Sequence, residues 1–212
     1  MKTVRLIVFA KAPLPGFAKT RLIPALGEVG AADLARQLLK HTVLQAVAAD
    51  IGPVELCVTP DTQDPVWQQL ADETGDAFTL TVQTEGDLGQ RMGQAMKRVI
   101  DEGQSVLLVG TDCPLLNAER LRLMAAALSN HDCALYPVDD GGYVALALNQ
   151  FDEAVFSDIP WSTDQVAALT RRNIARLNWS LWQGESLYDI DEADDLRRLQ
   201  ADQRSGVVTL CC

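Results

Sequence analysis

The chain has 212 residues, of which 48% are hydrophobic, so it can bury a substantial core as one large domain or two small ones. Its formal net charge of -11 at pH 7 argues against a nucleic-acid partner, because proteins that bind nucleic acids present a basic face. No apolar run approaches the roughly 20 residues of a membrane span. The apolar run after the basic N-terminus is also far shorter than the core of a signal peptide. We therefore expect a cytoplasmic protein that binds neither nucleic acid nor membrane.

Short apolar strands alternate with helical patterns along the whole chain. The predicted order is a strand over 4–10, a helix over 34–47, strands over 54–59 and 78–82, a helix over 92–100, a strand over 105–109 and a helix over 121–128. The last third continues with strands over 134–138 and 143–148 around a Gly-Gly turn, a helix from about 162, a strand over 179–182 and a helix from about 192. This alternation predicts an α/β fold with a mainly parallel sheet.

A loop rich in proline, glycine and cations follows the first strand, and no acidic residue precedes Glu28. In an acidic protein, the cluster of Lys11, Lys19 and Arg21 predicts an anionic ligand, foremost a polyphosphate, because lysine supplies a point charge and arginine a bidentate fork. The alternative is a solvated loop without a ligand, although its Pro-x-Pro-Gly spacing indicates a defined shape. Gly16-x-x-Lys19-Thr20 lacks the earlier glycine of a P-loop, which excludes a standard P-loop ATPase.

Two acidic segments are candidates for holding a divalent cation. Asp112 directly follows the most apolar strand, at the strand end where open α/β sheets bind ligands. Magnesium is typically held by one or two carboxylates together with phosphate oxygens and water, so Asp112 is the first candidate ligand. The alternative is a turn or helix-cap role, for which Asn117 is the better candidate. Asp191, and after it Asp189, is the candidate second ligand, whereas the acids that follow suit the start of a helix.

Two glycine-containing turns could contact a sugar or a base, because glycine lets the backbone approach a flat ligand closely. They are Glu85–Arg91 and Asp139–Tyr143, in which Asp87 and Asp140 could bind hydroxyl groups. A purely structural turn is the alternative for both. Asp140 is also the candidate general base, although the sequence does not single out a residue for that role.

The cysteines and histidines give little functional signal. The five cysteines show no metal-ligand spacing, which is typical of reduced thiols. The adjacent Cys211 and Cys212 either have a redox or metal-binding role or form an inert tail. His41 and His131 lie in or beside helical segments, and we expect both at the surface.

Taken in order, these segments resemble the nucleotide-diphospho-sugar transferase superfamily, which has the glycosyltransferase-A-type fold. They are most similar to a bacterial glycosyltransferase-like family associated with radical-SAM and arsenosugar gene sets, and more distantly to phospholactate guanylyltransferase. The matching motifs span residues 9 to 196: Phe9–Leu22, Gly86–Met92, Gly110–Pro114, Asp140–Tyr143, Trp161–Thr163 and Asp189–Asp191 with Asp195-Leu196.

The resemblance implies a single three-layer α/β/α domain over residues 1–212, with the nucleotide bound by the N-terminal half and the acceptor by the C-terminal half. It implies Mg²⁺ or Mn²⁺ between Asp112, Asp191 and the phosphates, with Lys19, Asp112 and Asp140 as the catalytic candidates. The nucleotide-binding candidates are Lys11, Gly16, Lys19, Thr20, Arg21, Gly86, Asp87, Leu88 and Gly89. The sugar or acceptor candidates are Asp140, Gly141, Gly142, Tyr143 and Trp161.

Two reactions fit this set of residues. In glycosyl transfer from a nucleotide sugar, a small acceptor attacks the sugar carbon. In nucleotidyl transfer, a phosphorylated small molecule attacks the α-phosphorus of a nucleoside triphosphate. Both reactions need positively charged groups that stabilise the departing phosphates. The family label favours glycosyl transfer, whereas the single acid of Gly110-Thr111-Asp112 and the three loop cations favour nucleotidyl transfer. A nucleotide-binding regulator without turnover is the third hypothesis.

Overall fold

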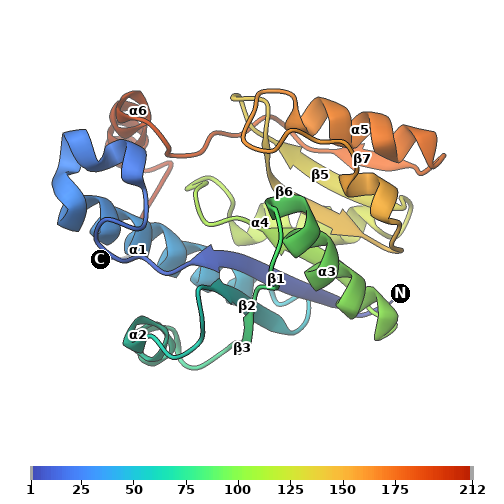
Figure 1. Ribbon diagram of the computed structural model, residues 1–212, viewed down its shortest axis with the longest axis horizontal. Helices are drawn as coiled ribbons and strands as arrows, with labels where there is room; N and C mark the ends of the chain where they lie inside the picture. Colours follow the sequence, from blue (N-terminus) through green and yellow to red (C-terminus); the bar gives the residue numbers. More distant parts are fainter. Residues whose placement is uncertain (1, 211–212) are drawn as a thin grey trace.

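The computed structural model describes residues 2–210, and within them seven strands form one mixed sheet (Figure 1). The strands are β1 (Val4–Lys11), β2 (Val54–Thr59), β3 (Thr79–Val82), β4 (Ser105–Val109), β5 (Cys133–Pro137), β6 (Tyr143–Leu148) and β7 (Leu181–Gln183). They lie in the order β3-β2-β1-β4-β6-β5-β7. All neighbouring strands are parallel except that β6 runs antiparallel to both β4 and β5.

Helices cover both faces of this sheet, which gives the predicted three-layer α/β/α architecture. The helices are α1 (Ile23–Ala49), α2 (Pro65–Thr74), α3 (Leu88–Asp101), α4 (Ala118–Ala127), α5 (Val166–Arg176) and α6 (Ala193–Arg204), with short 3-10 turns η1 (Thr20–Leu22) and η2 (Glu153–Phe156). Helix α1 has a kink at Gly27, whose φ is 71° and ψ 168°. None of the helices in the described part of the chain is long and apolar enough to cross a membrane.

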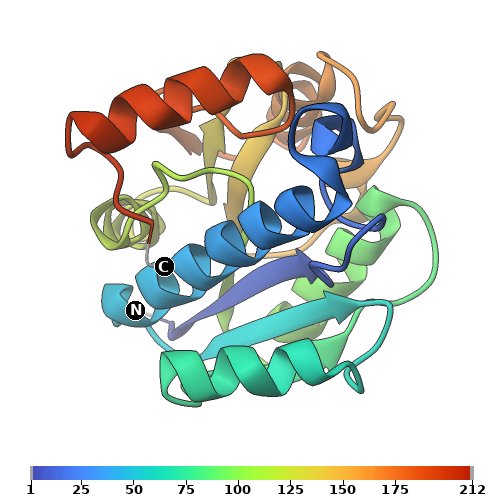
Figure 2. The ribbon, with the colours of Figure 1, turned by 90° about the vertical axis from the view of Figure 1, so that its left-hand side faces the viewer.

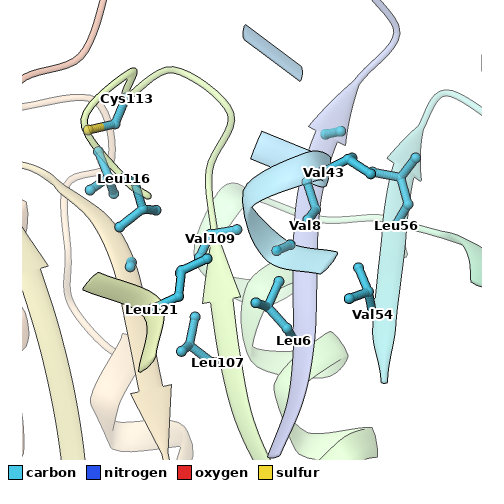
Figure 3. Close-up of a cluster of buried hydrophobic side chains, with 14 of the residues drawn as sticks. Leu6, Val8, Val43, Val54, Leu56, Leu107, Val109, Cys113, Leu116 and Leu121 are labelled. Carbon is cyan, nitrogen blue, oxygen red and sulfur yellow. The ribbon is translucent and has the colours of Figure 1, made fainter. Parts of the chain in front are cut away.

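The alternation of side chains along the strands builds a separate core on each face of the sheet. On β1, Leu6 and Val8 pack with α1, α2 and α4, and the close-up shows Val43 of α1 beside Val8 and Leu56 (Figure 3). Ile7 points to the opposite face and packs with Met96 of α3. Strands β1, β2 and β4 are buried along most of their length, as expected for strands inside the sheet with helices on both faces.

A third cluster attaches the C-terminal helix to the rest of the molecule. Leu22 and Leu38 pack against Tyr188, Ile190 and Leu199. Figure 2 shows α1 running beside β1, with α6 lying across the top of the view. The chain therefore returns at its end to the loop that follows its first strand.

The structure departs from the sequence-based expectations at several elements, including α1, which begins at Ile23 rather than near residue 34. Helix α2 was not anticipated, and α5 begins at Val166 rather than near residue 162. The surface prediction for His41 is wrong: it is 6% exposed, because α1 is covered on more than one side. The predicted cap is confirmed, since the Asn117 side chain accepts a hydrogen bond from the backbone N–H of Arg120. The predicted cysteine pair Cys211-Cys212 lies outside the described residues.

Strand direction decides which loops meet. The carboxyl ends of β1, β4, β5 and β7 lie at one edge of the sheet, because these strands point the same way. Since β6 is reversed, its first residue, Tyr143, lies at that same edge, opposite Pro137 at the end of β5. The candidate residues after β1, after β4 and around the β5–β6 turn are thereby brought together.

Candidate functional site

A cavity of about 770 Å³ opens at this edge of the sheet. Its lining includes most of the predicted site residues: Lys11, Lys19, Thr20, Arg21, Leu88, Asp112, Asp140, Gly142, Tyr143, Trp161 and Asp191. A pocket of a few hundred cubic ångströms or more is the usual size for a small-molecule site. The fold therefore brings most of the predicted site residues together around one cavity.

The loop after β1 is compact, as its proline and glycine spacing predicted. The backbone N–H groups of Phe17 and Ala18 both donate to the carbonyl of Leu14, at 3.0 and 3.1 Å. Gly16 has a φ of 74°, a conformation that glycine adopts without steric cost. The Lys11 ammonium lies 3.8 Å from the centroid of the Phe17 ring, a cation–π contact on the cavity wall.

Lys19 is the centre of the site. Its Nζ lies 2.6 Å from Asp112 Oδ1 and 2.9 Å from Asp191 Oδ1, and it donates to the carbonyl of Ile190 at 2.5 Å. Its side chain is only 6% exposed. Burial disfavours the charged amine, but Asp112 and Asp191 outweigh burial and raise the pKa of Lys19 above its usual value. Lys19 therefore stays charged at neutral pH and balances the two carboxylates.

The segment that carries Asp191 is fixed from both sides. The backbone N–H of Ile190 donates to the carbonyl of Asp112 at 2.9 Å, which ties the segment to the loop after β4. Asp195 Oδ2 accepts from the backbone N–H groups of Asp191 and Glu192, at 3.0 and 2.7 Å, where α6 begins. Asp195 therefore has the expected structural role at the helix start, whereas Asp191 faces the cavity.

The oxygens around Lys19 suit a hard cation. Two carboxylate oxygens and the Ile190 carbonyl converge on one positively charged nitrogen, so this position already accommodates a cation. Magnesium takes oxygen ligands and is commonly held by only one or two carboxylates plus substrate phosphates. Within residues 2–210, no three His, Cys, Asp or Glu side chains converge on one metal position. Asp112 and Asp191 could thus hold Mg²⁺ or Mn²⁺ with ligands from a substrate.

Two further acids, Asp189 and Asp140, lie near these carboxylates. Burial, together with the charges of Asp191, Asp140 and Asp112, raises the pKa of Asp189 to about 7. Asp189 does not contribute to the described cavity lining, whereas Asp140 does. Asp191 therefore lies in the cavity wall, whereas Asp189 lies outside the described wall.

The β5–β6 turn provides one side of the cavity. Asp140 Oδ1 accepts from the backbone N–H of Gly142 at 2.8 Å, so Asp140 stabilises its own turn while its carboxylate remains exposed. Burial raises the pKa of Tyr143, and the nearby Thr170 hydroxyl offsets only part of that rise. Tyr143 therefore stays protonated at neutral pH and contributes a wall rather than a base.

Trp161 forms another wall, and a glycine of α3 makes room for it. A Cβ atom at Gly89 would lie 2.4 Å from Cζ2 of Trp161. Trp161 also packs near Phe156, with ring centroids 6.5 Å apart. Gly89 thus shapes the cavity through the indole, although it does not itself appear in the described lining.

Other predicted binding residues lie outside the described lining of the cavity: Gly16, Gly86 and Asp87 of the nucleotide set and Gly141 of the sugar or acceptor set. Asp87 begins α3 with a capping box, in which its side chain accepts from the backbone N–H of Gln90 and the Gln90 side chain accepts from the backbone N–H of Asp87. Asp87 and Gly89 line a neighbouring cavity of about 460 Å³ beside Phe151 and Phe156. Their contact with a nucleoside stays a prediction.

Several lining residues were not predicted: Phe17, Ala18, Ala35, Met92, Thr111, Ser162, Thr163, Asp164, Val166 and Glu192. Phe17, Thr111 and Ser162 lie inside motifs that drew attention for neighbouring residues, so proximity to those motifs was an available signal. Ala35, Met92 and Val166 come from the apolar faces of helices, where the sequence pattern indicates core and nothing more.

Comparison with known proteins gives a family and a fold. The model of DUF2064, a family described as an uncharacterized protein conserved in bacteria, matches residues 42–163. No curated protein sequence matches this chain.

The solved structures that are similar include nucleotide-handling transferases. A protein of Desulfovibrio desulfuricans G20, provisionally named a nucleotide-diphospho-sugar transferase, is 29% identical, with a TM-score of 0.86 over 97% of this chain and 90% of its own. 4-Diphosphocytidyl-2C-methyl-D-erythritol synthase of Anaerococcus prevotii DSM 20548 is 13% identical, with a TM-score of 0.63 over 96% of both chains. CMP:2-keto-3-deoxy-manno-octonic acid synthetase, solved with CTP, is 10% identical, with a TM-score of 0.56 over 96% of this chain and 99% of its own. The two synthases share the fold.

Proposed function

The chain belongs to the DUF2064 family, and we propose that it is a metal-dependent nucleotidyltransferase that joins a nucleoside triphosphate to a small phosphorylated acceptor. The observation that carries this proposal is the convergence of three cations and two carboxylates on one cavity. Lys11, Lys19 and Arg21 come from the end of β1 and the segment that follows it, whereas Asp112 and Asp191 come from distant parts of the chain. Such a set suits a polyphosphate bound together with a divalent cation.

The reaction would use these groups as follows. An acceptor phosphate oxygen attacks the α-phosphorus, the bond from that phosphorus to the bridging oxygen of the β-phosphate breaks, and pyrophosphate leaves. Lys11 and Arg21 would hold the departing phosphates and neutralise the charge that develops on them. A divalent cation held by Asp112 and Asp191 would supply Lewis-acid stabilisation of the phosphoryl oxygens. The walls formed by Tyr143 and Trp161 would orient the acceptor.

Glycosyl transfer from a nucleotide sugar is the second candidate. The provisional name of the Desulfovibrio structure, at 29% identity over nearly the whole chain, favours it. The same cations and carboxylates would then stabilise a departing nucleoside diphosphate, and the acceptor would attack the sugar carbon instead of phosphorus. The two candidates differ in the bond that breaks, so they differ in their products.

A thermal-shift screen distinguishes the candidates at the binding step. Nucleoside triphosphates and nucleotide sugars would each be tested with and without Mg²⁺. A ligand at about 100 times its Kd stabilises a protein by roughly 2.7 kcal/mol, which is readily seen. We expect a Mg²⁺-dependent shift with one triphosphate. A shift with a nucleotide sugar alone would favour glycosyl transfer, and no shift with either class would refute both candidates.

Turnover then separates an enzyme from a regulator that only binds nucleotide. Pyrophosphate release in the presence of phosphorylated acceptors would support the proposal, whereas release of a nucleoside diphosphate would support glycosyl transfer. We expect Asp112→Asn to abolish turnover while the far-ultraviolet circular dichroism spectrum stays unchanged, because the side chain of Asp112 is 45% exposed. Wild-type turnover in Asp112→Asn would remove this carboxylate from the mechanism.

A further inference from the structure

We propose that Lys19 and the divalent cation compete for one position, so that metal binding at Asp112 and Asp191 releases the Lys19 ammonium for the phosphates. In the metal-free protein, Lys19 would act as a built-in counter-cation. The phosphate half of this inference rests on the proposed function, whereas the metal half depends only on the residues around Lys19.

The first step of the argument is that both cations need the same oxygens. Lys19 Nζ lies 2.6 Å from Asp112 Oδ1 and 2.9 Å from Asp191 Oδ1, and these carboxylates are the candidate metal ligands. An ion coordinated by both would have to lie close to the place that the ammonium occupies. Two positive centres at such a distance repel each other strongly outside bulk water. Simultaneous occupation is therefore excluded by charge as well as by space.

The second step is that the metal can reach these ligands from the solvent. The side chains of Asp112 and Asp191 are 45% and 38% exposed, respectively, and both line the cavity. The lysine is the buried member of the group, at 6% exposed. An ion arriving through the cavity thus meets the carboxylates directly, and the rearrangement that it requires is confined to one flexible side chain.

The third step is the fate of the displaced ammonium. Its hydrogen-bond and ion-pair partners within residues 2–210 are the three oxygens of Asp112, Ile190 and Asp191. After displacement it needs an anion or water, and its own loop already directs Lys11 and Arg21 to the cavity. Metal binding would thus free Lys19 to bind the phosphates together with Lys11 and Arg21. Metal and triphosphate are therefore expected to bind with positive cooperativity, each raising the affinity of the other by the same factor.

The first experiment measures Mn²⁺ affinity without nucleotide, by the electron paramagnetic resonance signal of free Mn²⁺. If the lysine occupies the site in more than about nine-tenths of the molecules, removing it tightens Mn²⁺ binding about tenfold or more. We expect this gain for Lys19→Met, whereas Lys19→Arg keeps a cation between the carboxylates and stays near the wild type. Lys11→Met is the matched control, because Lys11 lines the same cavity but lies over Phe17. We expect its Mn²⁺ affinity to change less than about twofold.

An unchanged or weaker Mn²⁺ affinity in folded Lys19→Met would overturn the inference, as would a complete lack of Mn²⁺ binding in every variant. A second measurement avoids any folding defect of the variant. In the wild-type protein, the ¹⁵Nζ resonance of the buried Lys19 ammonium is followed by NMR during a Mg²⁺ titration. We expect it to lose its ion-paired shift as the carboxylate resonances of Asp112 and Asp191 respond. A Lys19 signal that persists at saturating Mg²⁺ would refute displacement.

The coupling to phosphate is tested by calorimetric titration of the triphosphate identified in the screen, with and without Mn²⁺. In the wild type we expect Mn²⁺ to tighten its binding, and in Lys19→Met we expect most of that enhancement to be lost. Equal enhancement in both proteins would refute the release of Lys19 toward phosphate. If no nucleotide binds while Lys19→Met still gains Mn²⁺ affinity, the proposed function fails and the competition at the metal position stands.

Discussion

Substitution of Gly141 by alanine should destabilise the protein far more than the same substitution at the next residue. Gly141 lies in the β5–β6 turn with a φ of 91°, and a Cβ atom there would lie 2.0 Å from the carbonyl oxygen of Asp164. The carbonyl of Gly141 also accepts from the backbone N–H of Ala167 at 2.8 Å. Gly141 therefore packs closely against Asp164, which lines the cavity, and joins the turn to Ala167 in α5.

The expected loss has two parts. A non-glycine residue at positive φ costs about 1–2 kcal/mol. Non-bonded carbon–oxygen contacts lie near 3.3–3.6 Å, so the backbone at Asp164 would have to move by about 1 Å or more. Overpacking of this kind costs roughly 1–3 kcal/mol. We thus expect Gly141→Ala to lower the free energy of unfolding by about 2–5 kcal/mol, a large part of the stability of an ordinary domain.

Two other glycines separate the two contributions. Gly103 has a φ of 83° but open space around the missing Cβ, so Gly103→Ala should cost only the conformational part, about 1–2 kcal/mol. Gly142 has no positive φ, and its nearest atom is the movable Asp140 Oδ1 at 3.2 Å, so Gly142→Ala should cost less than about 1 kcal/mol. Urea denaturation followed by circular dichroism gives all three values. If Gly141→Ala is no worse than Gly142→Ala, the packing argument is wrong.

The remaining predictions concern a buried ion pair, a thiol and the loop cations. Glu55 is 2% exposed and accepts hydrogen bonds from Arg98 and Thr81. Arg98→Met should therefore lower the free energy of unfolding by about 1–3 kcal/mol, as measured by urea denaturation, and the second substitution Glu55→Gln should restore part of the lost stability. Burial raises the pKa of Cys133 to about 12 from 9.0, so the folded state holds a proton that the unfolded state loses. Stability should therefore fall as pH rises from 9 to 12, and Cys133→Ala should flatten that fall; parallel pH profiles would contradict this. Arg21→Met should weaken triphosphate binding about 10- to 150-fold, the equivalent of a charge-assisted contact of about 1.5–3 kcal/mol, and an unchanged Kd in calorimetry would remove Arg21 from the phosphate site.

The sequence predicted those parts of the fold that depend on local pattern. The strand over 105–109 has the predicted bounds, because a continuous apolar run can be buried only in the middle of the sheet. Helix α2 was missed although its signals were present: Asp64 caps it, Pro65 is its first residue and Gly75 ends it. Because α2 has only ten residues, its apolar stripe is short, and its helical periodicity is a weaker signal than the apolar runs of the neighbouring strands.

The candidate site was predicted in location but not in its internal contacts. The phosphate contact expected of Lys19 stays a prediction, and nothing in the sequence indicated that its ammonium lies between Asp112 and Asp191. No local pattern reports a contact between residues so far apart, because it depends on how the C-terminal segment crosses the sheet edge. The start of α5 was misplaced for a related reason: Ser162 has a φ of 66° and belongs to the cavity wall, where packing rather than propensity decides the backbone.

The bond between Ile190 N–H and the carbonyl of Asp112 has a consequence for biosynthesis. A chain leaving the ribosome exposes the loop after β1 and the loop after β4 well before Asp191 emerges. Until then, Lys19 has only one of its two carboxylate partners, and the cluster of Leu22 with Ile190 and Leu199 cannot form. The nascent protein should consequently complete its ligand pocket only after the segment around Asp191 has emerged, so that a chain stopped before that point has an incomplete pocket.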